Sequence, residues 1–179
     1  PRHIADPPPD RHGFVARMGK QWVRPLLVPI ARLCVRYAPH PAIRRAFWVH
    51  LVTPFFIFSN SRFVAPTIFG AAIAGRTDDI IQRHLFYFGV WEPNLTAFLS
   101  ARLRPGDIFV DVGANIGYFT LLASRLVGRD GKVIAVEASP NIFARLSDNL
   151  RRNHATNVAA TNIAVSDRVG TTQLFLGSD

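Results

Sequence analysis

The chain has 179 residues, of which 49% are hydrophobic, and it carries a formal net charge of +9. This length and composition suffice for one domain with a sizeable core plus an appendage, and they exclude a chain that is disordered throughout. The single cysteine, Cys34, excludes an internal disulfide framework and favours a reducing, cytoplasmic setting, and the six histidines show no zinc-site spacing, so we predict no metal.

All of the excess positive charge lies in the first part of the chain. Residues 1–76 contain eleven basic residues against two acidic ones, whereas residues 77–179 contain ten of each. The first part is also rich in proline, and its apolar segment 46–58 is shorter than the roughly 20 residues that span a bilayer. We therefore predict a mainly helical, basic N-terminal region over 1–76 and a second domain over 77–179.

Basic side chains in the N-terminal region recur at multiples of four residues, which places them along one side of a helix. They are Lys20, Arg24, Arg32 and Arg36, opposite Trp22, Leu26, Ile30 and Leu33. Two interpretations stay open: a helix that packs its apolar side on the second domain, and a helix in peripheral contact with a membrane surface. We expect no nucleic-acid partner, because no signature of a nucleic-acid-binding module accompanies the charge.

From residue 77 onward, helical and apolar strand patterns alternate. Strands are predicted over 108–112, 132–137, 157–165 and 171–176, and helices over 92–103, 118–127 and from 140 onward. The apolar run 108–112 is typical of a strand buried on both faces. Ser139 is expected to cap the last of the helices, with Pro140 in its first turn. This alternation predicts an α/β fold with a parallel sheet and right-handed crossovers.

A carboxylate and two glycines follow one another at the end of the first of these strands. The segment 107–126 reads DIFVDVGANIGYFTLLASRL, in which Asp111 ends the strand and Gly113 and Gly117 bracket a tight turn. Ligands bind beyond the carboxyl ends of the strands in such sheets, and glycine lets the backbone approach them closely. We therefore expect Asp111 to receive an ammonium group or to orient the loop.

A second carboxylate, Glu137, ends the next strand, 24 residues after Gly113. A carboxylate at this position can accept hydrogen bonds from both hydroxyls of a ribose, with Ala138 beside the adenine. The alternative for Glu137 is a cap on the following helix. Asn115 and Tyr118 stand where a dinucleotide fingerprint has glycines, which favours a cofactor without phosphates, such as S-adenosylmethionine.

Three stretches within residues 77–179 carry a resemblance to a known family. They read FVDVGANIGYFTLLASRLVGRDGKVIAVEASPNIFARLSDNLRRN, NVAATNIAVSDRVGTTQLFL and, upstream, YFGVWEPNLTAFLSARLRPGD. Together they resemble the FkbM family of S-adenosylmethionine-dependent methyltransferases. This resemblance implies a Rossmann-like class I methyltransferase fold and methyl transfer to a hydroxyl oxygen of a small natural product, sugar or lipid. By position it also implies cofactor-binding residues: Asp111, Gly113, Ala114, Asn115, Gly117, Glu137, Ala138 and Ser139, with Asn162 and Ala164 bordering the base.

The family pattern continues beyond the last residue of this chain. Family members carry a further parallel strand with an acidic segment near the methyl group, and this pattern does not occur before Asp179. We therefore expect residues 1–179 to be an incomplete domain, with an unpaired flank on strand 108–112, a tendency to aggregate and no methyl transfer. No general base is assigned. Glu92 is the upstream carboxylate that the resemblance places near the cofactor, and a cap on its own helix is the alternative.

Two other functions stay open from the sequence. One is a degenerate cofactor-binding or scaffold protein without catalysis, and the other is a nicotinamide-dependent oxidoreductase. A methyltransferase is favoured over both because Asp111, the glycine loop and Glu137 occur together in the expected order.

Overall fold

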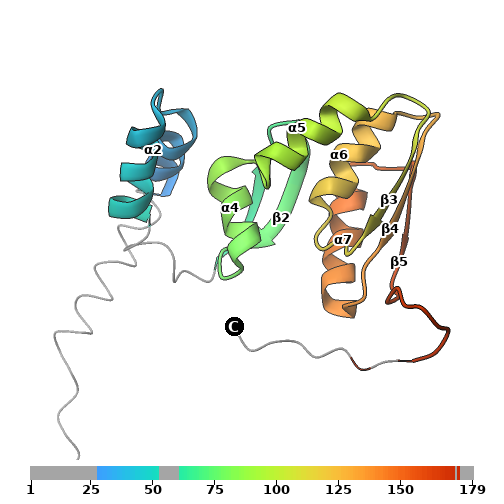
Figure 1. Cartoon of the computed structure of the whole chain (residues 1–179). Helices are drawn as coiled ribbons and strands as arrows, with labels where there is room; N and C mark the ends of the chain where they lie inside the picture. Colours follow the sequence, from blue (N-terminus) through green and yellow to red (C-terminus); the bar gives the residue numbers. More distant parts are fainter. Residues whose placement is uncertain (1–27, 53–60, 172, 174–179) are drawn as a thin grey trace, which may run out of the picture. The chain divides into compact units, whose positions relative to one another are not determined.

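The computed structural model describes residues 28–52, 61–171 and 173. The chain divides into two compact units, Pro1–Ser59 and Asn60–Asp179. The boundary therefore lies closer to the N-terminus than the predicted position between residues 76 and 77. The reason is that strand β2, which ends at Arg76, packs with the helices of the second unit (Figure 1).

The N-terminal unit is helical where the structure describes it. A helix over residues 28–37 is followed by α2 (Pro41–Phe47) and by a π-helical turn, η1 (Trp48–Val52). The Ala42 N–H donates a hydrogen bond of 3.2 Å to the side chain of His40, which caps α2. In the described parts of both units, no helix is long and apolar enough to cross a membrane.

The helix over residues 28–37 confirms the predicted element but not its predicted apolar side. Ile30 and Leu33 are more than half exposed, whereas Ala31 and Val35 are fully buried. Ala31 and Val35 lie one turn apart on the same face, which is therefore the buried face of this helix. The predicted positions Lys20, Trp22, Arg24 and Leu26 lie outside the described residues.

A two-stranded hairpin opens the second unit, and the sequence prediction missed it. β1 (Arg62–Pro66) pairs antiparallel with β2 (Ala72–Arg76). The turn is closed by a 2.8 Å bond from the Thr67 N–H to the Ala71 carbonyl, and Gly70 takes a φ of +84°. The prediction of a mainly helical region is wrong for this hairpin, because two five-residue strands around a single glycine give only a weak local signal.

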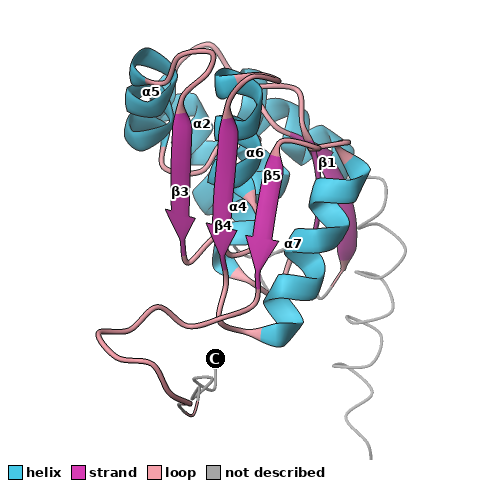
Figure 2. Cartoon of the chain, turned by 90° about the vertical axis from the view of Figure 1, so that its right-hand side faces the viewer, coloured by secondary structure: helices cyan, strands magenta, loops and turns pink. Residues whose placement is uncertain are grey.

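A parallel sheet in the order β3-β4-β5, flanked by helices, forms the larger part of this unit (Figure 2). Its strands are β3 (Ile108–Val112), β4 (Lys132–Val136) and β5 (Val158–Thr161). The helices are α4 (Ile80–Phe88), α5 (Pro93–Arg102), α6 (Tyr118–Val127) and α7 (Pro140–Arg152). These bounds confirm the predicted α/β fold class. The predicted strand 171–176 lies almost wholly outside the described residues.

One face of the parallel sheet is covered by α6 and α7, and no helix in the described part of the chain covers the other (Figures 1 and 2). On the uncovered face Ile108, Val110 and Val112 are 70%, 54% and 60% exposed. The prediction that this strand is buried on both faces is therefore wrong within the described residues, because nothing there packs on its second face. Among the described strands, β3 lies at one edge of this sheet and β5 at the other, so one flank of β3 is unpaired there.

The core lies where the sheet, α6, α7 and the hairpin meet. Leu146 and Leu150 of α7 are buried in it, and Ile142 and Phe143 pack against it. In α5, Leu99 is buried, whereas Phe98 is 57% exposed.

The buried amide of Asn149 connects the hairpin, α7 and the loop that precedes α6. Its Oδ1 accepts a 2.8 Å bond from the Ala74 N–H in β2, and its Nδ2 donates a 2.9 Å bond to the Ile116 carbonyl. The side chain is fully buried, so each of these bonds replaces one that water would otherwise make. Asn149 thereby connects the glycine-rich loop to the hairpin through its buried side chain.

Candidate functional site

The glycine-rich loop leaves β3 and turns into α6 at the carboxyl end of the sheet. The N–H groups of Gly113 and Ala114 both donate to the carbonyl of Val136, at 2.8 and 3.0 Å. The Gly117 N–H donates to the Ala114 carbonyl at 2.9 Å and begins α6. These bonds hold the loop across the ends of β3 and β4, where ligands bind in such sheets.

The two glycines of the loop have the same kind of backbone conformation but different surroundings. Gly113 has a φ of +77° and Gly117 a φ of +94°, both in the region that favours glycine. A Cβ on Gly117 would lie 2.7 Å from Leu146 Cδ1, whereas a Cβ on Gly113 would meet no atom within 4 Å. Gly117 is therefore needed for packing, and Gly113 leaves an open, exposed surface for a ligand.

We expect Gly117→Ala to destabilise the protein more than Gly113→Ala. Both variants strain the backbone by about 1–2 kcal/mol, and overpacking adds about 1–3 kcal/mol at Gly117 alone. Urea unfolding of the two variants measures the difference in free energy. Equal losses, or a larger loss at Gly113, would contradict this packing assignment.

The Glu137 carboxylate binds the backbone of both loops around it. Its Oε2 accepts from the Asn115 N–H and its Oε1 from the Ser139 N–H, each at 2.9 Å. Asn115 itself has a φ of +49°, and its side chain accepts from the Ile116 N–H. An ionised carboxylate offers about two acceptor positions on each oxygen. These two bonds therefore use about one acceptor position on each oxygen of Glu137.

Ser139 occupies the N-cap position of α7, and Pro140 lies in the first turn, as predicted. The Ser139 side chain makes no capping hydrogen bond, so that part of the prediction is wrong. The Ser139 N–H instead donates to Glu137, which gives this carboxylate a structural role at the start of the helix.

Asn162 fixes the backbone that follows β4. Its Nδ2 donates to the carbonyl oxygens of Glu137 at 2.7 Å and of Ala138 at 3.0 Å. The chain after β5 is thus tied to the segment that the sequence predicts to lie beside the adenine. Ala164, further along, is exposed.

Asp111 lies in β3 and is partly buried against α6. Its Oδ2 accepts a 2.5 Å hydrogen bond from the Thr120 hydroxyl. Burial raises the pKa of Asp111 above its ordinary value, and the nearby Glu137 carboxylate raises it further, against the opposing effect of the Thr120 bond. Two carboxylates so placed create a negative potential that favours a cationic group at the strand ends.

A strained residue lies at the start of α5, close to the same loop. Glu92 has a φ of +43° and makes no side-chain capping bond, so the interpretation of Glu92 as a helix cap is wrong. Its carbonyl accepts from the Thr96 N–H at 2.9 Å, and the Thr96 hydroxyl lies 3.1 Å from that of Tyr118, the first residue of α6. Burial raises the pKa of Tyr118.

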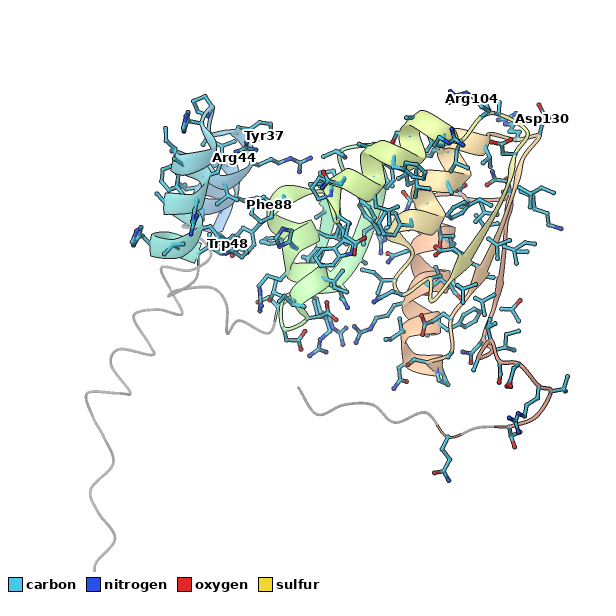
Figure 3. All side chains as sticks on the ribbon, viewed as in Figure 1. Tyr37, Arg44, Trp48, Phe88, Arg104 and Asp130 are labelled. Carbon is cyan, nitrogen blue, oxygen red and sulfur yellow. The ribbon has the colours of Figure 1, made fainter. Side chains whose placement is uncertain are left out.

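The structure brings the predicted site residues together at one end of the parallel sheet. These are Asp111, Gly113, Ala114, Asn115, Gly117, Glu137, Ala138, Ser139 and Asn162. Arg104 and Asp130 mark the opposite end (Figure 3). The sequence analysis missed Thr120 and Thr96.

Comparison with known proteins yields methyltransferases of several kinds. Residues 91–171, which include every predicted site residue, match the family described as Protein-L-isoaspartate(D-aspartate) O-methyltransferase (PCMT). The chain is 28% identical over 97 residues to the protein-L-isoaspartate O-methyltransferase of Caenorhabditis elegans, covering 52% of this chain and 43% of that protein. It is 43% identical over 80 residues to the 31-O-demethyl-FK506 methyltransferase FkbM of Streptomyces tacrolimicus, covering 45% and 30%.

A more distant similarity connects the chain to a solved structure. The crystal structure of P. horikoshii TYW2 in complex with MeSAdo aligns with a TM-score of 0.48 and 23% identity, over 63% of this chain and 39% of that one. The chain spans less than half the length of the curated relatives named above. The parallel sheet with its flanking helices is the class I methyltransferase type of α/β fold, as predicted.

Proposed function

We propose that the protein is an S-adenosylmethionine-dependent methyltransferase and that its second unit carries the cofactor site. The observation that supports this most directly is the position of Glu137, whose two oxygens each keep an acceptor position after binding the Asn115 and Ser139 N–H groups. When bound, S-adenosylmethionine supplies a methyl group on a sulfonium for transfer to a nucleophile.

The residues around Glu137 are suited to the separate parts of such a cofactor. Glu137 accepts hydrogen bonds from the two ribose hydroxyls, and the open side of Gly113 leaves room for the methionine part. Asp111 attracts the ammonium group. The remaining residues of the set complete the pocket: Ala114, Asn115 and Gly117 on the methionine side, and Ala138, Ser139 and Asn162 on the adenine side.

The methyl acceptor in this proposal is a hydroxyl oxygen of a small natural product, sugar or lipid. The 43% identity to 31-O-demethyl-FK506 methyltransferase FkbM supports an oxygen acceptor of this kind. A cytoplasmic protein whose basic N-terminal region makes peripheral contact with a membrane is part of the same proposal. Arginines at 32, 36, 44 and 45 in the described helices of that region support it.

Calorimetry on the full-length protein tests the cofactor directly. We expect S-adenosylhomocysteine to bind and NAD not to bind, because Asn115 and Tyr118 replace the glycines that a pyrophosphate requires. Transfer of a labelled methyl group to a panel of hydroxyl compounds then separates an enzyme from a degenerate cofactor-binding protein. Binding of NAD alone would overturn the proposal. Binding of S-adenosylhomocysteine without methyl transfer to any acceptor would support the cofactor site and contradict the methyltransferase activity.

A further inference from the structure

A second concave site lies between the hairpin and α7, and it shares no residue with the cofactor site. The cavity has a volume of about 550 Å³. Four arginines from three elements line it: Arg62 of β1, Arg76 of β2, and Arg145 and Arg152 of α7. We call this site the arginine groove.

The positive charge of the arginine groove is largely uncompensated. Arg62 lies directly opposite Arg76 in the hairpin, a pairing of like charges that costs stability. Arg76 is paired with Asp78 at 2.7 Å. Arg145 and Arg152 are seven residues apart, or two helical turns, and therefore lie on the same side of α7.

Acidic side chains do little to offset this charge. Asp148 is the single acidic residue among the described ones that line the groove, and it is paired with Arg151. Within the described part of the chain, Arg62, Arg145 and Arg152 form no ion pair with a carboxylate. Among the described residues, three of the four guanidinium groups around this cavity are therefore outside any ion pair.

The remaining wall of the arginine groove is apolar. Phe63, Val64, Ala74 and Gly75 form this part of the lining. The Phe63 ring packs on Phe86, with ring centroids 5.0 Å apart, and a Cβ on Gly75 would lie 2.8 Å from the Phe63 ring. The Phe63 ring therefore lies directly against the backbone of Gly75.

We propose that the arginine groove binds a phosphorylated small molecule. Guanidinium groups bind phosphate oxygens through paired, charge-assisted hydrogen bonds, and the apolar wall can cover the organic part of the ligand. The volume lies within the range of about 300–1,000 Å³ that is usual for small-ligand sites. Charges gathered around one cavity suit a compact, multiply charged group better than an extended nucleic-acid backbone. This proposal does not depend on the methyltransferase function.

Inorganic pyrophosphate is the probe for this proposal, and calorimetry measures its binding to the full-length protein. The titration is made at about 0.15 M salt, which screens weak attraction of the anion to exposed charges. The test variant is Arg145→Gln/Arg152→Gln. The matched control, Arg102→Gln/Arg129→Gln, removes the same charge from exposed positions outside the groove. We expect affinity for pyrophosphate to fall at least about tenfold in the test variant and less than about twofold in the control.

A third variant, Arg62→Gln, tests the hairpin side and replaces the double variant if that protein does not fold. Vesicles containing phosphatidic acid distinguish the source of the phosphate, because vesicle binding lost in the test variant alone indicates a lipid headgroup. Vesicle binding that is absent, or unchanged in the test variant, indicates a soluble ligand. The proposal is overturned if pyrophosphate does not bind, if test and control variants lose affinity equally, or if single-stranded RNA binds while pyrophosphate does not.

Discussion

Replacing Glu137 with alanine is expected to weaken S-adenosylhomocysteine binding by at least about tenfold, since each charge-assisted hydrogen bond contributes about 1.5–3 kcal/mol. The same change removes the acceptor for the N–H groups of Asn115 and Ser139. A buried donor left without a partner costs about 1–3 kcal/mol. We therefore expect a lower free energy of unfolding as well as weaker binding.

Glu137→Gln separates these two effects. Glutamine keeps one acceptor oxygen for the backbone but loses the charge, so stability is expected to fall less than in Glu137→Ala while binding still weakens. Asp130→Ala serves as the control, because Asp130 is exposed at the opposite end of the sheet (Figure 3). Calorimetry measures the affinity and urea unfolding the stability. An unchanged dissociation constant in folded Glu137→Gln and Glu137→Ala would rule out the ribose assignment.

Asp111→Asn is expected to weaken binding about tenfold without destabilising the free protein. The pKa of Asp111 is raised, first by burial and then by Glu137, so between its ordinary and its raised pKa the folded state binds more protons than the unfolded state. Stability contributed by this group is therefore present at low pH and is lost as pH rises through the raised pKa. At neutral pH the charge of Asp111 is a cost that asparagine removes.

Melting curves over a range from about pH 4 to neutral pH test this sign. The natural protein and Asp111→Asn should differ most at neutral pH, with the variant at least as stable, and should converge as the pH falls. The asparagine side chain in this variant keeps an oxygen that can accept from Thr120, so the local packing is preserved. A variant that is less stable at neutral pH and binds the cofactor normally would show that Asp111 serves the fold and not the ligand.

The sequence predicted best those features that depend on neighbouring residues. The strand 108–112 and the helix 118–127 have the predicted bounds, because an apolar run, two glycines and an amphipathic segment follow one another directly. The glycine-rich loop and Glu137 lie at the ends of β3 and β4, where they were predicted, for the same reason. The buried side of the helix 28–37 was predicted wrongly, since the choice of buried face depends on what packs against it.

The site contacts that sequence reasoning could not supply are those between distant residues. Neither the bond between Thr120 and Asp111 nor the one between Asn162 and the carbonyl of Glu137 has a signature in the local pattern. The sequence also gives no sign that the Glu137 carboxylate accepts hydrogen bonds from the N–H groups of Asn115 and Ser139. A carboxylate at a strand end predicts a ligand equally well whether or not the protein already occupies half of its acceptor positions.

The Asn149 amide determines where this domain can be cut from the rest of the chain. A piece that starts at residue 77 would keep every predicted cofactor residue but would lose Ala74, the hairpin partner of the buried Asn149 Oδ1. That acceptor would then lie unpaired beneath the loop that Asn149 holds through Ile116. A piece made for excision or domain exchange should therefore begin near residue 60, at the division between the two units. Such a piece contains both the hairpin and the glycine-rich loop that the hairpin supports.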